Sequence, residues 1–188
     1  ADWFESLPSK RRPFFVLDPT FGDGDVGFYT NPAVVPAIRE ALVPLADIMT
    51  PNSFELCHLT GVEPEIEERA ADSEEPEKVL GALVERARTL MTEHTRAVIL
   101  TGVSQNDDGA AKIGNIVVTK ADATLFFLDE VATQSKGLGD TFTTALVSRL
   151  LGSGLDGSLR GGDALSGATL SGAVQAASVH VQHAILAR

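Results

Sequence analysis

Cysteine and positive charge are both scarce in this sequence. Cys57 is the only cysteine among 188 residues, which excludes an internal disulfide and a cluster of thiolate metal ligands. The 15 Lys and Arg residues are outnumbered by 26 Asp and Glu residues, giving a net charge of −11, and basic side chains adjoin one another only at 10–12. We therefore do not expect a surface that binds nucleic acid.

Long apolar runs are missing as well. No stretch approaches the ~20 residues that a membrane-spanning helix needs, and residues 1–20 lack the basic-then-apolar pattern of a signal peptide. We expect a protein of the reducing cytoplasm without a membrane partner. The hydrophobic fraction of 44% and the charged fraction of 22% are typical of a globular protein, and residues 1–188 suffice for a single domain.

Apolar periodicity predicts alternating strands and helices. Strands are expected at 13–17, 47–50 and 97–101, and helices at 32–43, 54–59, 76–93, 140–151 and about 163–186. Residues 106–109 turn the chain, and 113–119 with 123–127 predict an antiparallel hairpin. The order βαβαβ, hairpin, two helices predicts one α/β domain with a mainly parallel sheet.

Two further segments, residues 1–7 and the acidic run at 63–77, also lead to expectations. Residues 1–7 have the character of the last turns of an amphipathic helix with no capping residue before them. We expect that the sequence begins within a domain whose N-terminal part is missing. The acidic run at 63–77 is interpreted as a solvated loop leading into a helix.

The most informative motif is a glycine turn at 136–141, Lys-Gly-Leu-Gly-Asp-Thr, at the start of a predicted helix. Gly137 and Gly139 let the backbone approach a ligand closely, and the first amides of a helix have no partners of their own, so the turn suits a phosphate or a developing oxyanion. Asp140 is poorly placed to bind phosphate and well placed to accept a proton from an attacking hydroxyl. Phosphoryl transfer to an alcohol is the prediction, with helix capping as the alternative role of Asp140.

Polar residues follow three successive predicted strands. They are Asp18 and Asp23 after the first strand, Thr50, Asn52 and Glu55 after the second, and Thr101 and Gly102 at the end of the third. Ligands gather at the carboxyl ends of strands in open α/β sheets, so these residues are candidates for one site. Each has a structural alternative: turn residues and a strand end for most, and a helix cap with its N3 partner for Asn52 and Glu55.

In combination these motifs resemble pyridoxal kinase, a family of the ribokinase-like superfamily. They are Asp18-Pro19 with Gly22-Asp23, the stretch 44–52 with Glu55 and 59–61, and the glycine turn at 137–142. The resemblance covers essentially the whole chain, as the C-terminal two-thirds of such a kinase, and implies a ribokinase-like three-layer sandwich. The sequence departs from the family at Thr20, where valine is usual, and at Leu138, where the usual threonine hydroxyl is lost.

The resemblance implies ATP-dependent phosphorylation of the 5′-hydroxymethyl group of pyridoxal and related B6 vitamers, giving pyridoxal 5′-phosphate. Asp140 is then the general base, and the backbone amides of Gly137, Leu138 and Gly139 form an anion hole. ATP contacts are implied for Asp18, Asp23, Tyr29, Thr50, Asn52, Thr101 and Gly102. Mg²⁺ is implied at Asp18, Asp23, Asn52 and Glu55, at the last two largely through water.

A homodimer and a requirement for K⁺ or Na⁺ beside Mg²⁺ are implied by the resemblance alone. The family holds the pyridine ring largely with residues near its N-terminus, and none of those is present in this sequence. No residue is therefore assigned to the pyridoxal ring.

Other functions stay open. Hydroxymethylpyrimidine kinase of the same superfamily acts on a similar flat heterocycle, but it usually has cysteine where Asp140 stands. A non-catalytic protein that binds nucleotide or pyridoxal would keep the glycine turn without turnover. A sugar or nucleoside kinase is disfavoured by the stretch 44–52, and His180 with His183 is a weak metal pair because no third ligand is apparent.

Overall fold

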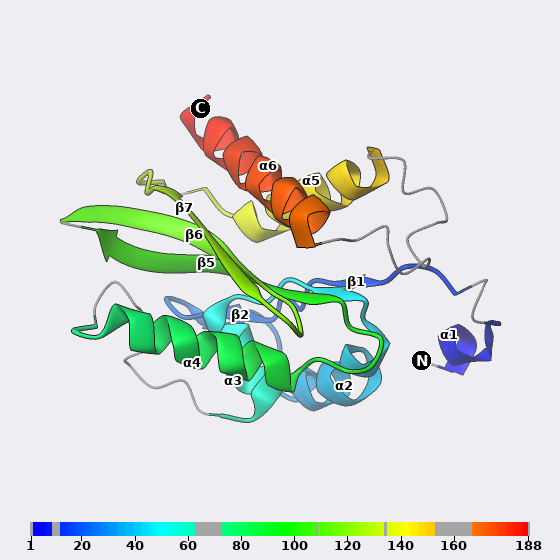
Figure 1. The fold of residues 1–188 in the computed structure, drawn as a ribbon. Coiled ribbons are helices and arrows are strands. Elements are labelled where there is room, and N and C mark those ends of the chain that lie inside the picture. Colours follow the sequence, from blue (N-terminus) through cyan, green and yellow to red (C-terminus); the bar gives the residue numbers. More distant parts are fainter. Residues whose placement is uncertain are drawn as a thin grey trace.

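The computed structural model describes residues 2–8, 12–62, 73–107, 109–133, 135–152 and 167–187. Figure 1 shows a central sheet with helices on both faces. This α/β arrangement in three layers confirms the predicted fold class. The predicted loop at 63–72 and the first residues of the last predicted helix, 163–166, lie outside the described residues.

The central sheet is mixed and has the strand order β1-β4-β5-β6-β7. Its strands are β1 (Val16–Leu17), β4 (Ile48–Met49), β5 (Ala97–Asp107), β6 (Ala110–Val118) and β7 (Ala123–Asp129). β1, β4 and β5 are parallel, as predicted from the order of elements, and β5–β6 and β6–β7 pair as antiparallel neighbours. The sheet is more evenly mixed than expected, because β1–β4 and β4–β5 are parallel pairings whereas β5–β6 and β6–β7 are antiparallel ones.

The helices divide between the two faces of the sheet (Figure 1). One face is covered by α2 (Val34–Ala41), α3 (Ser53–Thr60) and α4 (Pro76–Thr89), with the short 3₁₀ helix η1 (Val43–Leu45) after α2; the other face is covered by α5 (Leu138–Gly152) and α6 (Gly167–Leu186). β5 serves both cores because successive side chains of a strand point to opposite faces. Val98 and Leu100 pack with the first group of helices, whereas Ala97 and Ile99 pack with the second.

The first strand is shorter than its apolar sequence predicts. Only Val16 and Leu17 pair regularly with β4. Before them, the Phe15 amide donates to the Asp47 carboxylate at 2.8 Å, and the Phe15 carbonyl accepts from the amides of Asp47 and Ile48. The Asp47 side chain therefore takes the place of one backbone acceptor. Regular strand pairing begins only at Val16, although Phe15 stays bonded to the neighbouring segment.

Two features were not predicted. A separate two-stranded ribbon, β2 (Gly22–Asp23) with β3 (Gly27–Phe28), lies after β1. β5 runs six residues beyond the expected end at Thr101, through an irregularity between Leu100 and Val103 where Gly102 has φ +66°. Glycine tolerates this left-handed conformation, so the strand bends and continues instead of ending.

The N-terminal helical turn that the sequence predicts is present as α1 (Asp2–Ser6). The Phe4 ring lies 5.8 Å from the Phe15 ring, and the Arg12 guanidinium lies over Phe4 at 4.4 Å. Within the described ranges, no helix combines the length and the apolar character needed to cross a membrane.

Candidate functional site

The carboxyl ends of the parallel strands bring four predicted site residues to one edge of the sheet. Asp18 follows β1, and Thr50 follows β4. The Thr50 amide donates to the Leu17 carbonyl at 3.0 Å. Thr101 of β5 pairs with Asn52 in an isolated parallel bridge, and its amide donates to the Pro51 carbonyl at 3.0 Å. The predicted convergence of these strand ends is therefore present in the fold.

Asp18 is held between the sheet and α5. The hydroxyl groups of Thr143, Thr50 and Thr20 lie beside its carboxylate, and the Thr143 hydroxyl donates to the Thr50 hydroxyl at 3.1 Å. Burial raises the pKa of Asp18; the threonine hydroxyls oppose this, and the carboxylate of Asp140 adds to it. Asp18 and Asp140 thus lie within each other's electrostatic reach, although 122 positions separate them in the sequence.

Asn52 and Glu55 form a capping box at the start of α3. The Asn52 side-chain oxygen accepts from the Glu55 amide at 2.8 Å, and the Glu55 carboxylate accepts from the Asn52 amide at 3.1 Å. Both side chains also reach the chain after β1: Asn52 Nδ2 donates to the Gly22 carbonyl at 2.8 Å, and the Phe21 amide donates to Glu55 at 2.9 Å. The capping role that the sequence left as an alternative is confirmed.

Glu55 is a buried carboxyl, 3% exposed. Burial raises its pKa to about 7, the backbone amides of Asn52 and Phe21 oppose the rise, and the carboxylate of Asp18 adds to it. Both carboxylate oxygens already accept backbone amides. Each oxygen then keeps one lone-pair site for a water molecule or a cation.

Asp23 and Tyr29 lie on the β2–β3 ribbon. The Asp23 carboxylate accepts from the Asp25 amide at 3.0 Å, which closes the turn of the ribbon. Tyr29 is 55% exposed, and its amide donates to the Phe21 carbonyl at 2.9 Å. Burial raises the pKa of Tyr29, as do the carboxylates of Asp23, Glu55 and Asp25. The ribbon therefore stands beside the acidic end of the site.

The glycine turn takes the predicted form. Gly137 has φ +74°, and α5 begins at Leu138, so Gly139 and Asp140 lie in its first turn. The Thr141 amide is the first to be closed within the helix, by the Gly137 carbonyl at 3.0 Å. The preceding amides are the ones that a helix leaves for an external acceptor. Asp140 is exposed beside them.

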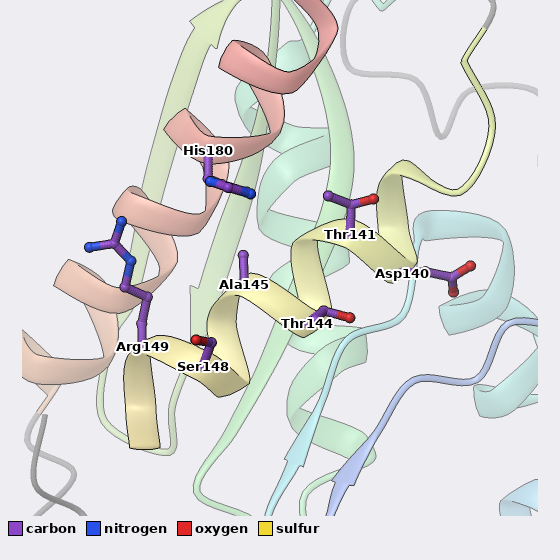
Figure 2. Close-up of a pocket in the computed structure, with 7 residues that line it drawn as sticks. All are labelled: Asp140, Thr141, Thr144, Ala145, Ser148, Arg149 and His180. Atoms are coloured by element: carbon purple, nitrogen blue, oxygen red, sulfur yellow. The ribbon is translucent and has the colours of Figure 1, made fainter. Parts of the chain in front are cut away.

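A groove of about 530 Å³ extends from Asp140 along α5 toward α6. It is lined by Asp140, Thr141, Thr144, Ala145, Ser148, Arg149 and His180. In Figure 2 the Asp140 carboxylate points away from Arg149 and His180, which lie toward the other end. Apart from Asp140, these groove-lining residues of α5 were not predicted as part of the site. The polar residues at 141, 144 and 148 share one helical face and could have indicated them.

The acidic residues suit a hydrated divalent cation. Asp18 raises the pKa of Glu55, and Asp140 raises that of Asp18, so unbalanced negative charge accumulates here. In the described part of the chain, no three Asp, Glu, His or Cys side chains are arranged to hold a metal ion by themselves, His180 and His183 included. Mg²⁺ keeps several waters and binds through one or two carboxylates, so this donor set fits it.

The family model described as phosphomethylpyrimidine kinase matches residues 4–187. The pyridoxine/pyridoxal/pyridoxamine kinase of Bordetella bronchiseptica is 35% identical over 150 residues, covering 79% of this chain and 48% of that protein. Pyridoxal kinase PdxY of Rubrobacter xylanophilus is 30% identical over 153 residues, covering 80% of this chain and 48% of that protein. The chain thus spans about half the length of the curated relatives it matches.

Solved structures show the same fold. Pyridoxal kinase from Staphylococcus aureus in complex with ADP superposes with a TM-score of 0.64 at 23% identity, covering 93% of this chain and 53% of that one. Pyridoxal kinase of Entamoeba histolytica with PLP gives 0.68 at 21% identity, covering 98% and 55%. Together with the family match, they show that the chain belongs to the phosphomethylpyrimidine kinase family and has the ribokinase-like fold of pyridoxal kinases.

Proposed function

We propose that this chain supplies the phosphoryl-transfer machinery of a kinase that uses ATP to phosphorylate the 5′-hydroxymethyl group of pyridoxal and related B6 vitamers. One observation carries the proposal: an exposed carboxylate, Asp140, stands in the first turn of α5 beside open backbone amides and faces Asp18 across the strand ends. A base and an anion cradle at one point are what transfer to an alcohol requires. We further propose that 1–188 act as one domain.

Asp140 is proposed as the general base. Its carboxylate accepts the proton of the substrate hydroxyl as the hydroxyl oxygen bonds to the γ-phosphorus, and the bond to the ADP oxygen breaks. The amides of Gly137, Leu138 and Gly139 stabilise the charge on the phosphoryl oxygens during this step. Leucine at position 138, where the family usually has threonine, can serve this role because the donors are main-chain amides.

ATP and Mg²⁺ are assigned to the acidic edge of the sheet. Nucleotide contacts are proposed for Asp18, Asp23, Tyr29, Thr50, Asn52, Thr101 and Gly102. Asp18 and Asp23 would hold Mg²⁺, with Asn52 and Glu55 acting largely through its waters, as the family resemblance implies. Bound there, the ion neutralises phosphate charge. Added K⁺ or Na⁺ is proposed only from the resemblance.

The neighbours support this choice of substrates. Staphylococcus aureus pyridoxal kinase has been solved with ADP, with AMP-PCP and with pyridoxal. The curated relatives are named as kinases of pyridoxine, pyridoxal and pyridoxamine. A homodimer in the cytoplasm is proposed on the family resemblance.

The test measures pyridoxal 5′-phosphate formed from pyridoxal and MgATP by the purified protein and by Asp140→Asn. We expect turnover by the wild type when the residues that hold the pyridine ring in the family are also present, and little turnover by residues 1–188 alone. In the active protein, Asp140→Asn should lower kcat by about 10²–10⁴-fold, the usual contribution of a general base. MgATP affinity should change little, because Asp140 contacts the alcohol and not the nucleotide. Full activity of Asp140→Asn would contradict the assignment.

Hydroxymethylpyrimidine is the second candidate substrate, since the matching family model is described as phosphomethylpyrimidine kinase. It is assayed in parallel. A higher kcat/KM for the pyrimidine than for pyridoxal would replace the proposed substrate while keeping the proposed chemistry. Binding of ATP or pyridoxal without turnover of either alcohol would favour the non-catalytic alternative.

A further inference from the structure

An aromatic cluster joins the β2–β3 ribbon to α3. We call residues 21–29, which contain both ribbon strands, the flap. The His58 ring of α3 lies 4.6 Å from the flap residue Phe28 and 4.4 Å from Phe54, and Phe28 and Phe54 are 5.1 Å apart. Phe21, fully buried at the other end of the flap, is 6.4 Å from His58. His58 and Phe54 are thus two α3 rings that each contact both flap phenylalanines, and His58 lies closer to Phe28 than Phe54 does.

The same helix also binds the flap through polar atoms of its N-terminal cap. Asn52 donates to the Gly22 carbonyl, and Glu55 accepts from the Phe21 amide. Gly22 approaches so closely that a Cβ placed there would overlap the Phe54 ring and lie 2.9 Å from the Gly27 carbonyl. Just before the flap, Thr20 has φ +44°, a conformation that a β-branched residue holds only where its surroundings impose it.

We propose that His58 is a positioning residue that clamps the flap to α3: its ring packs tilted against Phe28 of the flap, is supported edge-to-face by Phe54 of its own helix, and so sets where Asp23 and Tyr29 stand. Phe54 and His58 lie one turn apart on one side of α3, and Asn52 with Glu55 caps the same helix, so the cap and the clamp on the flap belong to one element. The location of Asp23 then follows from α3, because the ribbon itself contributes only two paired residues on each strand.

The consequence for catalysis rests on the proposed function. If Asp23 and Tyr29 contact the nucleotide, loosening the clamp raises the KM for ATP and leaves the chemistry at Asp140 intact. We expect His58→Ala to raise this KM roughly three- to tenfold, the equivalent of one or two lost aromatic contacts. His58→Phe keeps a ring and should restore the wild-type value.

A direct test needs no kinase activity. Tyr29 is the only tyrosine of this sequence, so labelling with 3-fluorotyrosine places one ¹⁹F probe on the flap, and Tyr29→Phe assigns its signal. We expect the wild-type resonance to be displaced from its position in urea, and His58→Ala to shift it toward that position. His58→Phe should leave it in place. The matched control is His94→Ala, an exposed histidine between α4 and β5.

The outcomes separate the clamp from the proposed function. A resonance unchanged in His58→Ala overturns the clamp. If far-UV circular dichroism shows that His58→Ala does not fold, Phe54→Leu is measured instead, because it removes the other α3 ring that contacts Phe28. The clamp requires Phe54→Leu to shift the resonance, and an unchanged resonance overturns the clamp. Addition of MgATP to the wild type is a separate arm: no response of the probe counts against a nucleotide site at the flap and leaves the clamp to be judged by the variants.

Discussion

At the scale of single residues, Glu55 combines a structural task with an electrostatic cost. Its carboxylate caps α3 and accepts the Phe21 amide, yet burial raises its pKa to about 7 from an ordinary value of 4.5. The folded protein therefore holds a proton that the unfolded chain releases between these two values. Stability from this group is fully present below pH 4.5 and is lost as the pH rises through about 7.

We expect the free energy of unfolding to fall by up to about 3 kcal/mol between pH 5 and pH 8 through this group. In Glu55→Gln the fall should be smaller, with the remainder from Asp18, whose pKa burial also raises. The measurement is urea unfolding at several pH values in the presence of a chelator. An equal slope in the wild type and in Glu55→Gln would contradict the shift assigned to Glu55.

The residue scale also shows what sequence patterns can assign. The spacing of Asn52 and Glu55 left a capping box open as the alternative to a metal site, and the cap is present. The same two side chains were predicted to organise Mg²⁺, and that role stays a prediction. A local pattern determines a cap because both partners lie within one helical turn, whereas a metal site depends on residues from distant strands.

At the scale of elements, Gly114 decides how β6 and β7 pair. A Cβ at this position would overlap the Phe126 carbonyl and lie 2.7 Å from the Phe127 ring. Gly114→Ala should therefore push β7 away and lower the free energy of unfolding by about 1–3 kcal/mol, the usual cost of overpacking. Urea unfolding followed by circular dichroism gives the value.

Gly172→Ala is the matched control, because nothing lies within 4 Å of a Cβ placed there in α6. Alanine should stabilise that helix by about 0.5–1 kcal/mol. If both substitutions gave the same sign, close approach of the strands would not explain the requirement at Gly114.

Element types were predicted better than element ends. The parallel strands and long helices follow from periodicity, because burial on a fixed face dictates it. The extension of β5 past Thr101 and the β2–β3 ribbon were missed. Both involve glycines that apolar periodicity does not mark: Gly102, with φ +66° in the irregular part of β5, and Gly22, which packs against Phe54 of α3.

At the scale of the whole molecule, a buried polar pair joins the sheet to the α5–α6 layer. Asn115 of β6 donates to the Ser178 hydroxyl of α6 at 2.7 Å, and this hydroxyl donates to the Val174 carbonyl at 2.9 Å. Ser178→Ala leaves the Asn115 amide without that acceptor and should lower the free energy of unfolding by about 1–3 kcal/mol.

The control for this pair is Gln175→Ala, an exposed position on the same helix. Removing both partners, in Asn115→Leu with Ser178→Ala, should recover part of the loss, because no buried polar group is then left unpaired. A double variant as unstable as the sum of the two single changes would mean that the hydrogen bond is not the source of the effect.

The sequence by itself determined the α/β class, the parallel strands, the glycine turn with its aspartate and the cap of α3. Each is encoded within a few neighbouring residues by burial, backbone freedom or a local hydrogen bond. Only the tertiary structure decided that Asp18 meets Thr143 and Asp140, that α3 holds the flap, and that α5 and α6 enclose a groove. Those contacts join residues far apart in the chain, and their geometry is set by how the layers pack.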